Sequence, residues 1–139
     1  MKYILSLSLL TFFLSSAMIQ KNTITKPQSA AYQSDSGKII YETYCLACHQ
    51  EDGSGVPNMN PPLIKTDWVL GDSTRLINVI LKGLKDTEIN GDSYSNEMPS
   101  HDFLTDYQIA EVLTYVRKNF GNQASAINSQ TVKKQRAKK

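Results

Sequence analysis

Apolar side chains recur at helical spacing in three stretches of the chain, and no stretch alternates as a β-strand would. The first stretch is SDSGKIIYETYC, in which the polar group at residues 34–36 is a typical helix start. Behind it, Ile40, Tyr41 and Tyr44 fall on one helical face. The pattern predicts a helix that leads directly into the sequence CLACH.

A second helix is predicted in the stretch GDSTRLINVILKGL. Asp72 or Ser73 is its cap, and the apolar residues that follow are spaced for one buried face. These residues are Leu76, Ile77, Ile80, Leu81 and Leu84.

The last helix has the clearest boundaries. In LTDYQIAEVLTYVRKNFG, Thr105 and Gln108 form a capping box, and Leu104 and Ile109 are spaced for a hydrophobic staple. Gly121 ends the helical pattern. The buried stripe is predicted to comprise Ile109, Val112, Leu113 and Val116. Together the three stretches predict an all-α domain.

The N-terminus is typical of an export signal. Lys2 precedes the apolar run YILSLSLLTFFL, and the small residues at 15–17 form a cleavage site. The run is shorter than the roughly 20 apolar residues that span a bilayer. We therefore predict a signal peptide at residues 1–17, a polar linker at 18–34 and a periplasmic body. The alternative is an uncleaved membrane anchor, because the two residues after the cleavage site extend the apolar run.

Charge is sorted along the chain. Residues 35–121 carry thirteen acidic and seven basic side chains, which leaves an excess of six negative charges. Residues 122–139 carry five basic side chains and no acidic one. This basic tail has low hydrophobicity and no apolar period, so we predict that it is disordered. It is expected to contact anionic lipid headgroups weakly, to fold back on the acidic body or to stay solvated without a role.

Cys45 and Cys48 are the only cysteines of the chain. Two cysteines cannot build a disulfide framework, and with one adjacent histidine they fall short of the four ligands of a structural zinc site. A redox dithiol would require a βαβ context that the pattern lacks. C-x-x-C-H in an exported chain instead matches the attachment signature of a c-type haem.

The chemistry of haem accounts for this spacing. Two thiols one helical turn apart can add to the two vinyl groups of one porphyrin edge, and the imidazole of His49 then points to the iron as proximal ligand. The 87 residues from 35 to 121 also lie in the size range where a hydrophobic core is marginal. A haem is therefore expected to fill the centre of the domain.

Residues 35–121 resemble a class I cytochrome c domain. Gly37 and Tyr41 stand where that family has the glycine and the aromatic residue of its first helix, where the missing Cβ lets the last helix cross closely. Val112 and Tyr115 occupy the matching contact positions on the last helix. The resemblance implies an all-α class I cytochrome c fold with about three to five helices around one covalently bound haem c and its iron.

The resemblance also implies the remaining haem contacts. SYSNEMPS is similar to the Met-Pro segment that supplies the family's sixth iron ligand, here Met98. GSGVPNMNPPL is similar to the segment whose proline carbonyl accepts the proximal imidazole N–H, here Pro61 or Pro62. His101 is the rival sixth ligand, and a second imidazole would lower the potential. Trp68, the only tryptophan, either donates its indole N–H to a haem propionate or packs in the core.

With both axial positions filled, the iron has no open site for oxygen, peroxide or a small-molecule substrate. The expected function is one-electron transfer between respiratory, dehydrogenase or reductase partner proteins, as a free carrier or as a subunit of a larger oxidoreductase, and not enzymatic catalysis. The alternative is a haem enzyme or gas-binding sensor whose sixth ligand dissociates. Nucleic acid is not an expected partner, because an exported protein meets little of it.

Overall fold

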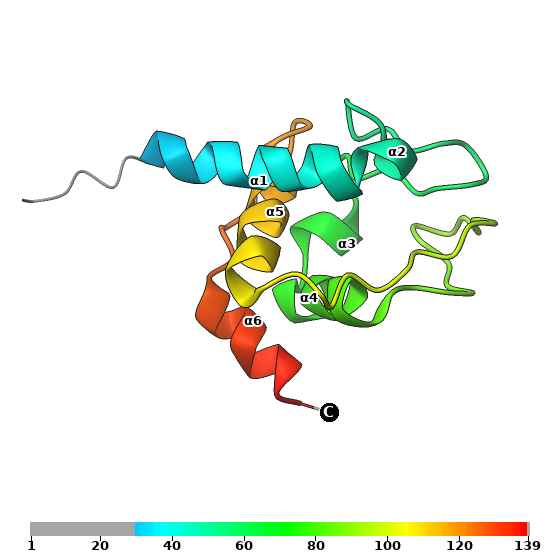
Figure 1. Ribbon diagram of the computed structural model, residues 1–139. Coiled ribbons are helices and arrows are strands. Elements are labelled where there is room, and N and C mark those ends of the chain that lie inside the picture. The colour runs from blue at the N-terminus through cyan, green and yellow to red at the C-terminus, as the bar shows by residue number, and fades with distance from the viewer. Residues whose placement is uncertain (1–29, 139) are drawn as a thin grey trace, which may run out of the picture.

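The structure, a computed structural model, describes residues 30–138, with side chains described from Asp35 onward. Six helices lie in this part of the chain (Figure 1). They are α1 (Ala30–Tyr44), α2 (Leu46–His49), α3 (Asp67–Leu70), α4 (Ser73–Lys82), α5 (Asp106–Lys118) and α6 (Ser129–Arg136). The described residues contain isolated β-bridges but no strand, which confirms the all-α prediction.

The first helix begins earlier than its polar residues suggested. Because α1 starts at Ala30, residues 30–34 of the predicted linker are helical. The predicted signal peptide at residues 1–17 and the rest of the linker lie outside the described residues. Between residues 30 and 138, no helix combines the length and the apolar character needed to cross a membrane.

Helices α1 and α5 pack against each other (Figure 1), and Gly37 lies where they touch. A Cβ atom at this position would overlap the backbone carbonyl oxygen of Glu111 and lie 2.8 Å from the Cβ of Tyr115. Glycine therefore permits the close approach of the two helices, as the sequence predicted. One turn further along α1, the buried ring of Tyr41 lies with its centroid 5.5 Å from that of Tyr115.

The buried core joins α1, α4 and α5. The predicted stripe of α5 is buried along its whole length, as are three of the apolar residues predicted for the second helix. Those three are Leu76, Ile77 and Ile80. Asp72 caps α4, and α5 begins with the predicted capping box, in which Thr105 and Gln108 each accept the other's backbone N–H.

The prediction that the basic tail is disordered is wrong. Within it, residues 129–136 form α6, which packs across α5 and α4 (Figure 1). Val132 is fully buried, and Ile127 exchanges two hydrogen bonds with the hydroxyl of Thr114, at 3.0 and 3.2 Å. Two apolar residues, Ile127 and Val132, are too few to produce a periodic pattern, although both are buried in the core cluster. Among the predicted alternatives, the tail folds back on the body.

Candidate haem site

Cys45 and Cys48 lie at the junction of α1 and α2. The backbone N–H groups of Cys48 and His49 both donate to the carbonyl of Cys45, at 3.2 and 2.9 Å, so the segment forms one helical turn. Cys48 is exposed, Cys45 is half-buried and His49 is only 8% exposed. Burial, with a smaller contribution from Cys48, raises the pKa of Cys45 to about 11. The two thiols therefore flank a buried imidazole at the spacing that the sequence predicted.

A backbone carbonyl holds the imidazole of His49. Its Nδ1–H donates to the carbonyl oxygen of Pro61 at 3.1 Å, which decides between the two prolines that the sequence offered. Because a carbonyl can only accept, the proton is on Nδ1 and the lone pair of Nε2 stays free. Burial lowers the pKa of His49, although the bond to Pro61 acts in the opposite direction. The ring is therefore the neutral imidazole that binds metal ions.

A tight loop brings the Pro61 carbonyl to this ring. Gly55 has a φ of +69°, and a Cβ there would overlap the carbonyl oxygen of Asn60 and lie 2.6 Å from that of Pro61. The Gly55 N–H donates to the carbonyl of His49 at 3.1 Å. The loop thus closes against the end of α2, and it can do so because residue 55 has no side chain.

Met98 reaches the site from a second long loop. Its N–H donates to the carbonyl of Leu84 and its carbonyl accepts the N–H of Leu84, both at 2.9 Å, directly after α4 ends. The Met98 side chain is half-buried and packs against the core. The backbone pairing therefore positions the predicted sixth ligand relative to α4.

The two loops are also joined to each other. The Ser95 N–H donates to the carbonyl of Asn58 at 2.9 Å, and the side-chain amide of Asn96 donates to Oδ1 of Asn60 at 3.2 Å. These contacts were not predicted from the sequence. Asn96 and Asn60 are 36 residues apart and belong to no periodic pattern, so no local signal indicates that they meet.

Two adjoining cavities bring the predicted site residues together. All seven line one cavity or both: Cys45, Cys48, His49, Pro61, Pro62, Trp68 and Met98. The inner cavity, beside Trp68, is walled mainly by apolar side chains, including Ile80 and Val112. The outer cavity, beside Cys48, is edged by Tyr44 and His101. An apolar interior with an imidazole, a thioether and two thiols on its walls fits a haem, which has an apolar ring and two axial positions.

His101, the rival ligand, is held at the rim of the outer cavity. Its Nδ1–H donates to the carbonyl of Pro99 at 3.0 Å, and its ring lies against those of Tyr44 and Phe103. These contacts place the imidazole among exposed aromatic side chains. The ring therefore has partners of its own at this position.

Trp68 lines the inner cavity beneath a charged group. The guanidinium of Arg75 lies 4.5 Å from the centroid of its ring. Arg75 donates from Nη2 to the carbonyl of Asp67 at 2.6 Å, whereas its buried Nε has no hydrogen-bond partner in the described part of the chain. A donor buried without a partner carries a desolvation cost that an added acceptor would remove.

The cytochrome c family matches residues 34–120, and the chain belongs to this family. The chain is 35% identical over 120 residues to a cytochrome c-552 of Thermus thermophilus, an alignment that covers 79% of this chain and 80% of the relative. It is 35% identical over 94 residues to the cytochrome c subunit of a quinone alcohol dehydrogenase from Gluconobacter oxydans, covering 66% of this chain. It is also 30% identical over 131 residues to the fructose dehydrogenase cytochrome subunit of Gluconobacter japonicus, covering 88% of this chain. The chain spans only 20% and 26% of the lengths of these two dehydrogenase subunits.

Family membership confirms the cofactor and the class of protein. The chain carries a covalently bound c-type haem with its iron, and Cys45 and Cys48 are consistent with its attachment. The class is that of the cytochromes c, and the relatives include cytochrome subunits of dehydrogenases.

Replacing Gly55 by alanine should destabilise the protein more than replacing Gly91. Both glycines have a positive φ, which costs alanine about 1 kcal/mol at either position. Only at Gly55 would the new Cβ also meet backbone atoms, which adds about 1–3 kcal/mol; a Cβ at Gly91 has nothing within 4 Å. Denaturant unfolding of the two haem-loaded variants measures this difference. If both variants lost the same free energy of unfolding, the loop next to His49 would be able to accommodate the new Cβ without additional destabilisation.

Proposed function

We propose that this chain is a periplasmic one-electron carrier whose haem iron is ligated by His49 and Met98. The observation that carries the proposal is the meeting of a buried neutral imidazole and a thioether on one largely apolar cavity. Cys45 and Cys48 would hold the haem by thioether bonds, and Pro61 would orient the proximal imidazole. When bound, the haem supplies reversible one-electron oxidation and reduction of its iron.

The residues of the cavity favour electron transfer over chemistry at the iron. An imidazole and a thioether would together hold the iron and would leave no position for a substrate. The thioether and the apolar wall favour the less charged ferrous state and hence a comparatively high potential. A haem enzyme or a gas sensor would need a sixth ligand that leaves the iron, whereas the Met98 backbone is held by its two hydrogen bonds to Leu84.

Arg75 is proposed to neutralise a haem propionate that lies beside the ring of Trp68. A carboxylate next to the Trp68 ring would accept a hydrogen bond from the Arg75 Nε, which otherwise has no partner in the described residues. The guanidinium would also lower the cost of placing a negative charge beside an apolar cavity. Arg75 therefore fits this role better than a solvated arginine on a helix face would, because its Nε is buried and lacks an acceptor in the described residues.

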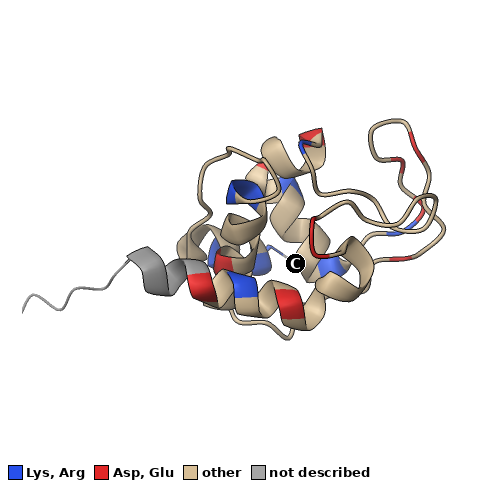
Figure 2. Cartoon of the chain, turned by 90° about the horizontal axis from the view of Figure 1, so that it is seen from above, with Lys and Arg blue, Asp and Glu red and all other residues tan. Residues whose placement is uncertain are grey.

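The rim of the outer cavity is the face that we propose for partner docking. Tyr44 and Phe103 are 44% and 62% exposed there, with ring centroids 5.3 Å apart. Residues 84–102 carry five acidic side chains and one lysine, Lys85, which is itself paired with Glu97. Figure 2 shows acidic positions along the long loops at the right of the view, while most Lys and Arg lie on the helices. The matching partner is a redox protein with an apolar contact patch inside a basic rim.

The compartment and the partner class follow from the same proposal. Residues 1–17 would direct export, and an uncleaved signal would leave the carrier anchored to the membrane. The exposed lysines of α6 would allow weak contact with anionic lipids. Because relatives include cytochrome subunits of dehydrogenases, a dehydrogenase, a reductase or another respiratory protein is the proposed partner.

Denaturation should not release the haem. Two thioether bonds survive extraction with acidified acetone, so mass spectrometry of the denatured protein should find the chain plus one haem. The double variant Cys45→Ser/Cys48→Ser should lose the haem in the same treatment. A wild-type mass without haem, after expression with a competent maturation system, would contradict attachment at these cysteines.

Met98→Ala should abolish the weak sulfur-to-iron charge-transfer band of the ferric protein and admit cyanide or carbon monoxide to the iron. His101→Ala is the matched control, because it removes the rival ligand three residues away and should leave the band in place. Absorption spectra with and without the added ligand distinguish the two variants. The opposite pattern would make the iron bis-histidine and remove the argument for a high potential.

The acidic side chains of residues 84–102 should steer small charged redox reagents. At low salt, the reaction with a cationic reagent should be faster than with an anionic one of similar potential, and the ratio should fall as ionic strength approaches about 0.1 M. The triple variant Asp86→Asn/Glu88→Gln/Asp92→Asn should lower the ratio, whereas Lys133→Gln/Lys134→Gln on α6 should not. Stopped-flow rates over a salt series test this. Equal rates with both reagents at every salt concentration would exclude an acidic docking face.

A further inference from the structure

Helix α6 lies beyond the family match, which ends at residue 120, yet it is a fixed part of the structure. It packs on α5 and α4, with Val132 and Gln135 buried. The side chain of Asn128 caps its first turn by accepting the N–H of Thr131 at 2.9 Å. A helix that is packed and capped in this way can hold a segment that it contacts in place.

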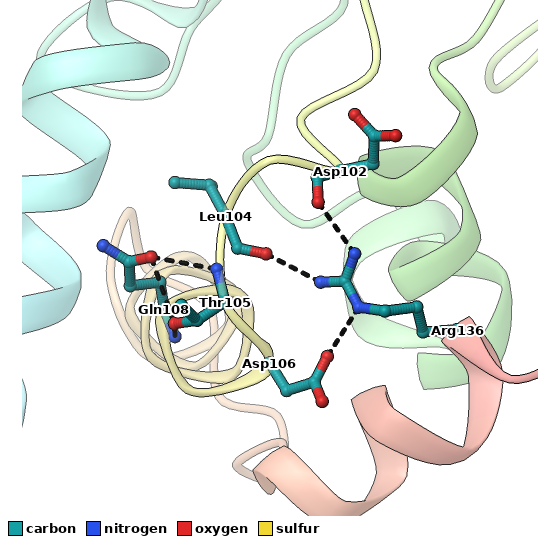
Figure 3. A network of polar contacts seen from close by, with 6 residues as sticks. All are labelled: Asp102, Leu104, Thr105, Asp106, Gln108 and Arg136. Atoms are coloured by element: carbon teal, nitrogen blue, oxygen red, sulfur yellow. Dashed lines mark hydrogen bonds and ion pairs between the residues drawn. The ribbon is translucent and has the colours of Figure 1, made fainter.

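Arg136, the last residue of α6, makes three hydrogen bonds to one short segment (Figure 3). Its Nε donates to the carboxylate of Asp106 at 2.7 Å. Its Nη1 donates to the carbonyl of Asp102 at 2.8 Å, and its Nη2 donates to the carbonyl of Leu104 at 2.7 Å. Figure 3 shows the guanidinium with these three acceptors around it. The planar fork of arginine suits such a set of diverging acceptors, and a lysine could not reproduce it.

The segment that Arg136 contacts is the one that follows Met98. Residues 99–105 form neither helix nor strand, so their position depends on contacts with other elements. Near the start of the segment, the His101 N–H donates to the carbonyl of Ile80 on α4 at 2.7 Å. Further along, two successive contacts come from Arg136. The chain after Met98 is therefore tied to α4 on one side and to α6 on the other.

We infer that Arg136 is a positioning residue for Met98 and that α6 acts as a clamp on residues 99–105. By holding the backbone of this segment, the clamp limits the movements that would take the thioether away from the iron. The inference rests on the proposed role of Met98 as sixth ligand. The clamp itself consists of three contacts between described residues.

The two backbone contacts act on residues 99–105 directly, whereas the ion pair reaches Asp106, the first residue of α5. The side chains of Arg136 and Asp106 are 34% and 28% exposed, and partly exposed pairs are weakened by solvent screening. The two bonds to carbonyl groups are charge-assisted and act on the backbone of the segment directly. Removing the guanidinium of Arg136 should therefore loosen residues 99–105 more than removing the charge of Asp106.

Four variants of the full-length, haem-loaded chain separate a clamp from a general contribution to stability. Arg136→Ala removes all three bonds, and Arg136→Lys keeps the charge without the fork. Asp106→Asn keeps both carbonyl bonds. Thr114→Ala is the matched control, because it weakens the attachment of the tail at Ile127 without touching residues 99–105. For each variant we would measure the melting temperature, the rate of cyanide binding to the ferric iron and the hydrogen exchange of peptides covering residues 99–105.

Arg136→Ala and Arg136→Lys are expected to speed cyanide binding by at least about tenfold, because the loss of even one charge-assisted hydrogen bond corresponds to a factor of about that size. Exchange in residues 99–105 should increase by a similar factor. Asp106→Asn should change both by less, and Thr114→Ala should change neither beyond what its melting temperature accounts for. If cyanide binding and exchange instead followed the melting temperature alike in all variants, or did not change in Arg136→Ala, the clamp would be refuted.

Failure of the proposed ligand would be seen separately. A wild-type ferric protein without the sulfur-to-iron band would exclude Met98 as the ligand, whatever the variants do. Hydrogen exchange would then still decide on the clamp: faster exchange of residues 99–105 in Arg136→Ala and Arg136→Lys, but not in Thr114→Ala, supports it, and unchanged exchange overturns it.

Discussion

The close packing of α1 against α5 at Gly37 is the constraint on which the haem site depends. Since no side chain separates the two helices there, the end of α1 is placed relative to α5 by backbone contact. That end leads into Cys45, while α5 contributes Val112 to the wall of the inner cavity. The hydroxyl of Tyr41, on α1, donates to the carbonyl of Gln50 at 2.6 Å and so ties the end of α2 to α1. The attachment segment and the cavity wall are thus placed by one helix contact.

Loops, rather than long helices, position Met98 and the carbonyl group that orients His49. The Pro61 carbonyl depends on a turn closed at Gly55, and Met98 depends on pairing with Leu84 beyond the end of α4. Loops of this kind are stable only when other elements satisfy their backbone groups. Here the two loops bond to each other, to α4 and to α6. The site is therefore a product of many long-range contacts around one short helical turn.

Because the tail folds onto the body, its basic side chains occupy defined positions on the surface. Arg136 is engaged with the body, whereas Lys133, Lys134 and Lys138 stay exposed on α6 or next to it. The acidic residues between 84 and 102 lie on the loops that edge the outer cavity. A net charge of +2 thus conceals two surfaces of opposite sign. Such separation orients a molecule in the field of a partner even when its total charge is small.

The sequence by itself determined the features that neighbouring residues create. The haem attachment turn, the capping box at Thr105 and the buried stripe of α5 all depend on spacings of a few residues, which a helix converts directly into geometry. Only the tertiary structure decided between Pro61 and Pro62, joined Asn96 to Asn60 and folded the tail onto the body. These outcomes depend on contacts between residues far apart in the chain. No local pattern encodes such contacts, because each requires only one or two side chains that happen to face a complementary group once the helices have packed.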